Sequence, residues 1–169
     1  MLKNLSLCEL TPKEDIEQRI EGLRQRMTQH GIDFSIILQN VDLLYFTGTT
    51  QKGVLVIPVD KEPVFFVEKS LNRAAFESPL ELTPIKREKD ARDILIDKGI
   101  LKGRGGMEHD VLPVAVFERW KNVLGFHDFA DVSTLIKDLR IVKSPFEISQ
   151  IKKSGEIIAH VLGKAKELI

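Results

Sequence analysis

Hydrophobic residues near the start of the chain recur every three or four positions, which is the period of an amphipathic helix. Those on the predicted buried face are Ile16, Ile20, Leu23 and Met27. A capping-box pattern begins at Thr11, with Pro12 at the first helical position, and Gly31 follows the last apolar position. The sequence therefore predicts a helix from Pro12 to about His30.

A second helical pattern occupies the end of the chain. Ser144, Pro145 and Glu147 supply an N-cap, a proline at the first helical position and the acid that closes a capping box. The apolar stripe that follows consists of Ile148, Ile151, Ile158, Val161, Leu162, Ala165 and Leu168. No later element covers this stripe, because the sequence stops at Ile169. We therefore expect the chain to be the front part of a larger protein.

Between these two helices, apolar and β-branched runs alternate with further helical patterns. The run at 33–39 suits a strand buried on both faces, and the runs at 54–59 and 64–68 suit an antiparallel hairpin. Pro58 cannot donate a ladder hydrogen bond, so we expect an edge or a bulge there. The remaining predicted elements are strands at 80–86, 105–109 and 129–132 and helices at 70–76, 90–98 and 112–124.

Capping residues and glycines mark the ends of several elements. Ser70 and Asp90 are the predicted caps of two helices, and Asn40 begins a single predicted helical turn. A loop from Gly48 to Gly53 follows that turn, and we expect it to be exposed.

The interleaving of helices and strands defines the fold class. It predicts an α/β fold with three layers, α/β/α, around a mixed sheet of five or six strands. Pro84 implies an irregular or edge position for its strand. Because no linker divides the chain earlier, residues 1–142 are expected to form one domain.

Composition excludes several function classes. The 25 lysine and arginine residues balance 25 aspartate and glutamate residues, so no global field attracts nucleic acid or an acidic membrane. No apolar run approaches the roughly 18 to 20 residues that cross a bilayer, and the first ten residues do not read as a secretory signal. The single cysteine, Cys8, excludes an internal disulfide and fits a reducing compartment. We expect a soluble, cytoplasmic protein.

Candidate catalytic groups are sparse. The four histidines lie far apart in the sequence, and no nucleophile elbow, Walker loop or dinucleotide-binding glycine motif is present. His109 stands between Glu108 and Asp110, and a carboxylate beside an imidazole can orient it as a ligand or a base. Neighbouring residues on a strand point to opposite faces, however, which favours a structural histidine at a strand end. We predict no catalytic residue and no metal ligand in this chain.

Several short pieces, taken in order, resemble the N-terminal domain of the creatinase, prolidase and Xaa-Pro aminopeptidase family of "pita-bread" metallopeptidases. The pieces are Arg19-Ile20, Leu23-Arg24 and Met27, then Gly31-Ile32-Asp33, then Asn40 with Tyr45-Phe46-Thr47-Gly48, and finally Asp131, Leu139-Arg140, Lys143-Ser144 and Glu147-Ile148. The closing pattern Leu-Arg-x-x-Lys-Ser-x-x-Glu-Ile is the most specific of them.

This resemblance implies a ribonuclease-H-like fold without nuclease chemistry for residues 1–142. Residues 143–169 would then be a linker and the first helix of a catalytic domain that lies beyond Ile169. In that domain, family members hold two divalent metal ions, usually manganese, cobalt or zinc, with two Asp, one His and two Glu. None of these five ligands can be matched in this chain.

The resemblance also implies a role for the domain. Family enzymes are commonly homodimers in which this domain of one subunit overhangs the other subunit's active site. The residues expected to face a proline-containing peptide substrate are Asn40, Tyr45, Thr47, Gly48, Thr49, Thr50 and Gln51. For Asn40 a helix cap and for Tyr45 a core aromatic are the competing interpretations. Leu43 and Leu44 depart from the more polar residues often found there.

Two functions remain open on this basis. The first is a non-catalytic domain that serves dimerisation and substrate gating in an Xaa-Pro peptidase. The second is a protein-binding module of a pseudo-peptidase without hydrolase activity. The substrate could be a dipeptide, a longer Xaa-Pro peptide or a creatine-like amidine.

Overall fold

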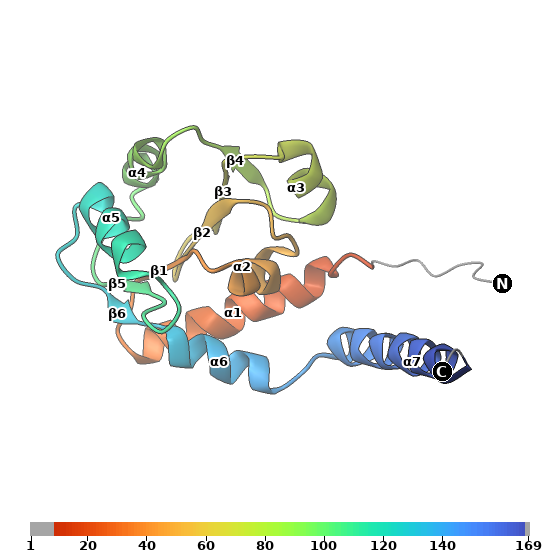
Figure 1. Cartoon of the computed structure of the whole chain (residues 1–169). Coiled ribbons are helices and arrows are strands. Elements are labelled where there is room, and N and C mark those ends of the chain that lie inside the picture. Colours follow the sequence, from red (N-terminus) through yellow and green to blue (C-terminus); the bar gives the residue numbers. More distant parts are fainter. Residues whose placement is uncertain (1–8, 168–169) are drawn as a thin grey trace.

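The structure, a computed structural model, describes residues 9–167 (Figure 1). Its helices are α1 (Lys13–Gln29), α2 (Asn40–Thr47), α3 (Leu71–Glu77), α4 (Glu88–Asp97), α5 (Val114–Leu124), α6 (Ser133–Ile141) and α7 (Pro145–Glu167). Its strands are β1 (Phe34–Ile37), β2 (Gly53–Pro58), β3 (Val64–Val67), β4 (Leu82–Pro84), β5 (Gly105–Met107) and β6 (Ala130–Asp131). The predicted α/β fold with a mixed sheet is confirmed.

The six strands form one sheet in the order β4-β3-β2-β1-β5-β6. Strand β2 runs antiparallel to both of its neighbours, whereas β1, β5 and β6 are parallel to one another. Pro84 lies in the edge strand β4, as predicted. The expectation for Pro58 is wrong, because β2 is an interior strand with unbroken register. Pro58 is the last residue of β2, and Val59 N donates the next hydrogen bond, 2.9 Å to Asp33 O.

Two hydrophobic clusters lie on opposite faces of the sheet and give the three layers. Helices α1, α2, α3 and α6 cover one face and bury Leu55, Phe65 and the apolar stripe of α1. Helices α4 and α5 cover the other face, where Phe34, Phe66 and Trp120 belong to the second cluster. Successive residues of a strand therefore serve opposite clusters, as the two-residue period of a strand requires.

Local capping differs from the prediction at several helices. Helix α1 begins at Lys13, and Thr11 makes no capping bond. Helix α4 begins at Glu88, so Asp90 lies inside it, where its carboxylate accepts a hydrogen bond of 3.0 Å from Arg87 N. Ser70 precedes α3 with a left-handed backbone conformation and makes no side-chain cap.

Helix α2 is longer than the predicted single turn, and its cap is Gln39. The Oε1 atom of Gln39 accepts a hydrogen bond of 2.8 Å from Asp42 N. Asn40 is therefore the first helical residue and not the cap. Helix α6 was not predicted at all, although Leu135 and Ile136 anchor it in the first cluster.

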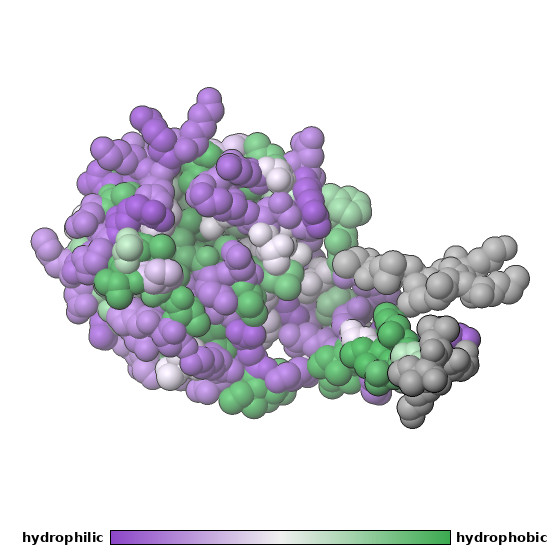
Figure 2. All heavy atoms as spheres, viewed as in Figure 1, coloured by the Kyte–Doolittle hydropathy of each residue, from purple (hydrophilic) through white to green (hydrophobic). Residues whose placement is uncertain are grey.

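Helix α7 projects from the body of the domain (Figure 1). The predicted capping box at its start is present: Glu147 N donates to Ser144 Oγ over 3.1 Å, and Ser144 N donates to Glu147 Oε2 over 2.9 Å. From Ile148 to Leu162, its isoleucine, valine and leucine side chains are 37–59% exposed, and Figure 2 shows hydrophobic atoms gathered over this helix. Leu168 of the predicted stripe lies outside the described residues.

Candidate functional site

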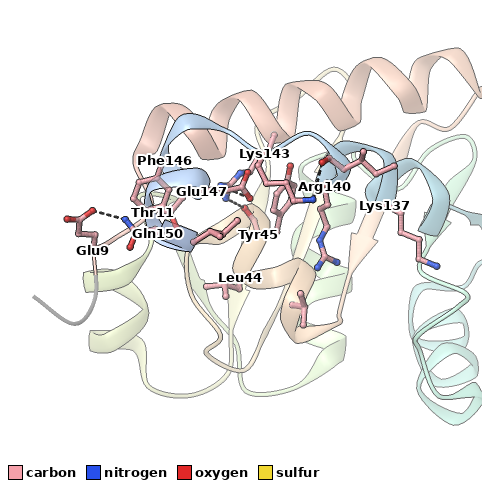
Figure 3. A pocket seen from close by; sticks show the side chains of 14 residues that line it. Glu9, Thr11, Leu44, Tyr45, Lys137, Arg140, Lys143, Phe146, Glu147 and Gln150 are labelled. Atoms are coloured by element: carbon pink, nitrogen blue, oxygen red, sulfur yellow. Dashed lines mark hydrogen bonds and ion pairs between the residues drawn. The ribbon is translucent and has the colours of Figure 1, made fainter. Parts of the chain in front are cut away.

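A groove of about 720 Å³ opens where α2, α6 and the start of α7 meet (Figure 3). Its apolar wall consists of Val41, Leu44, Tyr45, Ile141, Phe146 and Ile151. Its polar rim is formed by Glu9, Lys137, Arg140, Lys143, Glu147 and Gln150. The groove thus brings together residues from the beginning, the first third and the end of the chain.

Tyr45 lines this groove and is held by Arg19 of α1. The Nη1 atom of Arg19 donates a hydrogen bond of 2.7 Å to Tyr45 O, and the guanidinium lies 4.4 Å from the centre of the Tyr45 ring. Burial raises the pKa of the Tyr45 hydroxyl, which points to Leu139 O at 3.4 Å. Tyr45 is therefore a half-buried aromatic on the groove wall.

The connection between α6 and α7 is rich in polar contacts. The Nη1 atom of Arg140 donates to Asp42 Oδ1 over 2.8 Å, and Lys143 Nζ donates to the carbonyls of Arg140 (2.7 Å) and Ile141 (3.0 Å) at the end of α6. The Oγ atom of Ser144 donates to Asp15 Oδ2 over 2.5 Å. Every polar residue of the pattern Leu-Arg-x-x-Lys-Ser-x-x-Glu-Ile thus makes a specific bond at this junction.

The loop after α2 is less exposed than predicted. Within the predicted loop from Gly48 to Gly53, Thr49 and Gly53 are buried, so the expectation of an exposed loop is wrong at these two residues. Thr47, a candidate substrate-facing residue, is the last residue of α2 and is also buried. The Oγ1 atom of Thr47 donates to Leu43 O over 2.7 Å, and Thr49 Oγ1 donates to Glu77 Oε2 over 2.5 Å. A buried hydroxyl needs a hydrogen-bond acceptor, which Thr47 finds within its own helix and Thr49 finds in α3. Hydropathy alone does not indicate either acceptor.

The other three candidate residues of this segment lie nearer the surface. Gly48 adopts a left-handed conformation with φ 78° and ends α2, a position that favours glycine. Gln51 is half-buried, and its backbone N donates to Thr49 Oγ1 over 3.2 Å. Thr50 is exposed.

Asn40 lies in a different place from Tyr45. It is exposed and lines a second cleft of about 360 Å³ near the ends of β1 and β2, whose apolar wall includes Trp120. The candidate substrate-facing residues are therefore divided between the groove, a buried turn and this cleft.

Glu108, directly after β5, is a fully buried acid. Its Oε2 atom accepts hydrogen bonds from Leu38 N (2.8 Å) and Gln39 N (3.2 Å), whereas Oε1 has no partner within the described part of the chain. Burial raises the pKa of Glu108 to about 8, and the neighbouring Asp42 adds to the rise. The carboxyl group is thus favoured in its protonated form.

The neighbours of Glu108 point elsewhere. The ring of His109 packs edge-on against Phe117 with centroids 5.0 Å apart, and Asp110 is paired with Lys137. Hydrogen bonds from Lys137 and Ser133 hold the pKa of Asp110 below its usual range. Over residues 9–167, no group of three His, Cys, Asp or Glu side chains could hold a metal ion. The described residues therefore offer no site for the two divalent ions, which the family resemblance places in a domain beyond Ile169.

The sequence matches the Creatinase/Prolidase N-terminal domain family over residues 19–142. The chain belongs to this family. It is 28% identical over 144 residues to the Xaa-Pro dipeptidase of Pyrococcus furiosus, covering 84% of this chain and 40% of that protein. It is 26% identical over 164 residues to the creatinase of a Bacillus species, covering 90% and 40% of the two chains.

Solved structures confirm the fold of this Creatinase/Prolidase N-terminal domain. The Xaa-Pro dipeptidase from Bacillus anthracis superposes with a TM-score of 0.80 at 20% identity, covering 91% of this chain and 44% of that one. The chain thus spans less than half the length of these relatives. Within the described residues, no helix is long and apolar enough to cross a membrane.

The resemblance was found from sequence, but the contacts at the junction were not. The sequence pattern assigns no contact to Arg19, Asp15 or Asp42. One signal was available for Arg19, because it occupies the helix face of α1 that otherwise carries Ile16, Ile20 and Leu23. A charged residue on a buried stripe calls for a partner.

Proposed function

We propose that this chain is the non-catalytic N-terminal domain of an Xaa-Pro peptidase, of the aminopeptidase P or prolidase kind. The observation that carries the proposal is the family match over residues 19–142, with relatives named Xaa-Pro dipeptidase that are more than twice as long. The domain would serve dimerisation and substrate gating for a catalytic domain beyond residue 169.

The exposed face of α7 supports this arrangement. Ile151, Ile158 and Leu162 are each 59% exposed, and a helix with a continuous apolar stripe normally buries it against another element. A catalytic domain that follows α7 would cover the stripe. In this arrangement, residues 1–142 form the N-terminal domain and residues 143–169 the linker and first helix of the next one.

The expected metal ions belong to that next domain. Two divalent ions, manganese, cobalt or zinc, would be held there by two Asp, one His and two Glu. The acids described here have other partners: Asp42 is paired with Arg140, Asp110 with Lys137, and Glu108 binds backbone N–H groups. No catalytic step is therefore assigned to this chain.

The gating role concerns the face that carries α2 and the loop after it. Tyr45 on the groove wall, Asn40 at the second cleft, and Thr50 and Gln51 are the candidates whose side chains are not fully buried. In a homodimer, this face of one subunit would restrict access to the partner's active site. The substrate would be a proline-containing dipeptide or longer peptide, or a creatine-like amidine, and the protein would be cytoplasmic.

A hydrolysis assay tests the proposal directly. The purified 169-residue chain is incubated with an Xaa-Pro dipeptide and manganese, and an active prolidase in the same buffer serves as the positive control. The expected result is no turnover by the chain. Hydrolysis that copurifies with the chain through several columns would overturn the claim that the catalytic centre lies elsewhere.

The coding sequence that follows residue 169 decides between the two functions. An Xaa-Pro peptidase requires two Asp, one His and two Glu ligands in that sequence. If these ligands are missing, the peptidase proposal fails and the protein-binding module of a pseudo-peptidase takes its place.

A further inference from the structure

Arg19 is a buried cation that contacts three different helices. It lies on α1 with 8% of its side chain exposed. Its Nη2 atom lies 3.4 Å from Asp15 Oδ2 on the same helix and 3.4 Å from Glu147 Oε1 on α7. Its Nη1 atom donates to Tyr45 O of α2 over 2.7 Å. The fork of the guanidinium thus joins α1, α2 and α7 at one point.

Both residues of the α7 capping box are held by α1. The carboxylate of Glu147 accepts from Ser144 N through Oε2 and faces Arg19 through Oε1. The hydroxyl of Ser144 accepts from Glu147 N and donates to Asp15 Oδ2 over 2.5 Å. The first turn of α7 is therefore attached to α1 through two side chains that also define where the helix begins.

A second attachment lies one to two turns further along α7. Gln150 Nε2 donates to Glu9 Oε2 over 2.7 Å, and Lys153 is paired with the same carboxylate. Glu9 and Lys153 are about half exposed, and exposed pairs of this kind hold a helix weakly. From Ile151 to Ala165 every described side chain of α7 is exposed. The direction of α7 therefore depends mainly on the buried contacts at its first turn.

We infer that Arg19 is a positioning residue that fixes the direction in which α7 leaves the domain. Without its guanidinium, Glu147 keeps its bond to Ser144 and the helix still starts, but the helix loses its charged link to α1 and α2. The consequence for the whole protein rests on the proposed function: the orientation of α7 sets where a following catalytic domain stands relative to the groove and the loop after α2. The contacts of Arg19 with Asp15, Tyr45 and Glu147 do not themselves depend on peptidase activity.

The inference is tested by measuring the position of α7 in the full 169-residue chain. The single cysteine is removed (Cys8→Ser), and spin labels are attached through Glu118→Cys on α5 and His160→Cys on α7, both of which are exposed. Double electron–electron resonance then gives the distance distribution between the domain body and α7. Fluorescence of the single tryptophan, Trp120, which is buried, reports separately whether the body is folded.

The expected result is loss of the narrow distance peak in Arg19→Met, with Trp120 fluorescence unchanged. The matched control is Arg24→Met on the same helix, because Arg24 donates to the carbonyls of Pro58 (3.0 Å) and Lys61 and not to α7. It should leave the distance peak in place. Arg19→Lys should recover the peak in part, since one ammonium can pair with a carboxylate but cannot reproduce the fork.

A narrow, unchanged distance peak in a folded Arg19→Met chain would overturn the inference. If Arg19→Met unfolds the body, Glu147→Gln is the deciding variant. It removes the charge that faces Arg19 at a side chain that is only half-buried, so the body should stay folded. A broadened distance peak in Glu147→Gln then supports the positioning role of Arg19, and an unchanged peak rejects it. Neither readout involves hydrolysis, so failure of the proposed peptidase function would leave this result standing.

Discussion

Arg140 Nη1 lies 2.8 Å from Asp42 Oδ1, which joins α6 to the first turn of α2 across 98 positions of the sequence. Asp42 is almost fully buried, whereas the Arg140 side chain is 40% exposed. The carboxylate also lies in the first turn of α2, where the helix dipole favours negative charge. Asp42 is therefore a buried anion whose charge is balanced by a residue of the family pattern.

The first prediction concerns a substitution that removes this charge balance. Arg140→Met should lower the free energy of unfolding by about 1 to 2 kcal/mol, because Asp42 stays buried without its cation; solvent access to Arg140 keeps the cost below that of a fully buried pair. Urea denaturation measures this change in the free energy of unfolding. The control is Lys137→Met, also on α6, whose partner Asp110 is solvated, and it should leave the denaturation midpoint unchanged. An equal loss of unfolding free energy in both variants would contradict the conclusion that buried Asp42 needs Arg140 as its partner.

The second prediction concerns Glu108 and pH. Its pKa of about 8 in the folded chain lies above the usual value of 4.5, so the folded chain holds this proton more strongly. The stability that Glu108 contributes is therefore complete below about pH 4.5 and is lost as pH rises toward 8, with a slope of at most about 1.4 kcal/mol per pH unit. Glu108→Gln imitates the protonated acid and should flatten this slope.

Urea denaturation at several pH values between 5 and 9 is the measurement, with Glu118→Gln, an exposed acid on α5, as the control. Glu108→Gln should be more stable than the unmodified chain at pH 8 and lose that advantage near pH 5. A Glu108→Gln chain with the same pH dependence as the unmodified protein would show that Glu108 is ionised in the fold.

Elements with a strong local pattern were predictable from the sequence. The apolar stripe of α1, the buried run of β1 and the capping box of α7 each depend on residues within a few positions of one another. Helix α4 shows the limit of this reasoning, because Asp90 reads equally well as an N-cap and as the third residue of a capping box with Arg87.

The junction could not be predicted, because its bonds join residues that are distant in sequence. Ser144 donates to Asp15 over 129 positions, and the two residues meet because α1 and α6 pack on the same face of the sheet. The burial of Thr49 was also not predictable, because its partner Glu77 lies 28 positions away at the end of α3. Hydropathy indicates that a residue is polar but does not identify its hydrogen-bond partner.

The third prediction tests the buried turn after α2. The Thr49 hydroxyl, followed by Arg73, holds the pKa of Glu77 below its usual range. Thr49→Val keeps the shape but removes this donor, so the free energy of unfolding should fall by about 1 kcal/mol at pH 7. Because a lowered pKa stabilises only above the unfolded value, the loss should shrink as pH falls below about 4.5.

Thermal denaturation at pH 7 and pH 3 measures the effect, and Thr50→Val on the exposed neighbour is the control. Thr50→Val should leave the midpoint unchanged. A Thr49→Val chain with unchanged stability at pH 7 would show that the hydroxyl is not engaged with Glu77.

The last prediction contrasts two glycines in different surroundings. A Cβ at Gly53 would lie 2.2 Å from Phe66 O and 3.1 Å from the Phe65 ring, and backbone in the interior of a sheet cannot give way. A Cβ at Gly155 on α7 would meet nothing within 4 Å. Gly53→Ala should therefore cost about 2 kcal/mol or more of unfolding free energy, whereas Gly155→Ala should stabilise α7 by roughly 0.5 to 1 kcal/mol.

Circular dichroism at 222 nm during thermal unfolding separates the two effects. Gly53→Ala should shift the main cooperative transition to lower temperature, since it disturbs the contact between β2 and β3. Gly155→Ala should raise the helical signal before that transition and leave its midpoint in place, because a Cβ at Gly155 meets nothing within 4 Å and the link from Ser144 to Asp15 lies at the start of α7. A loss of helix in Gly155→Ala would mean that another surface approaches α7 closely at this glycine, and the exposed stripe would then be covered in the chain as it stands.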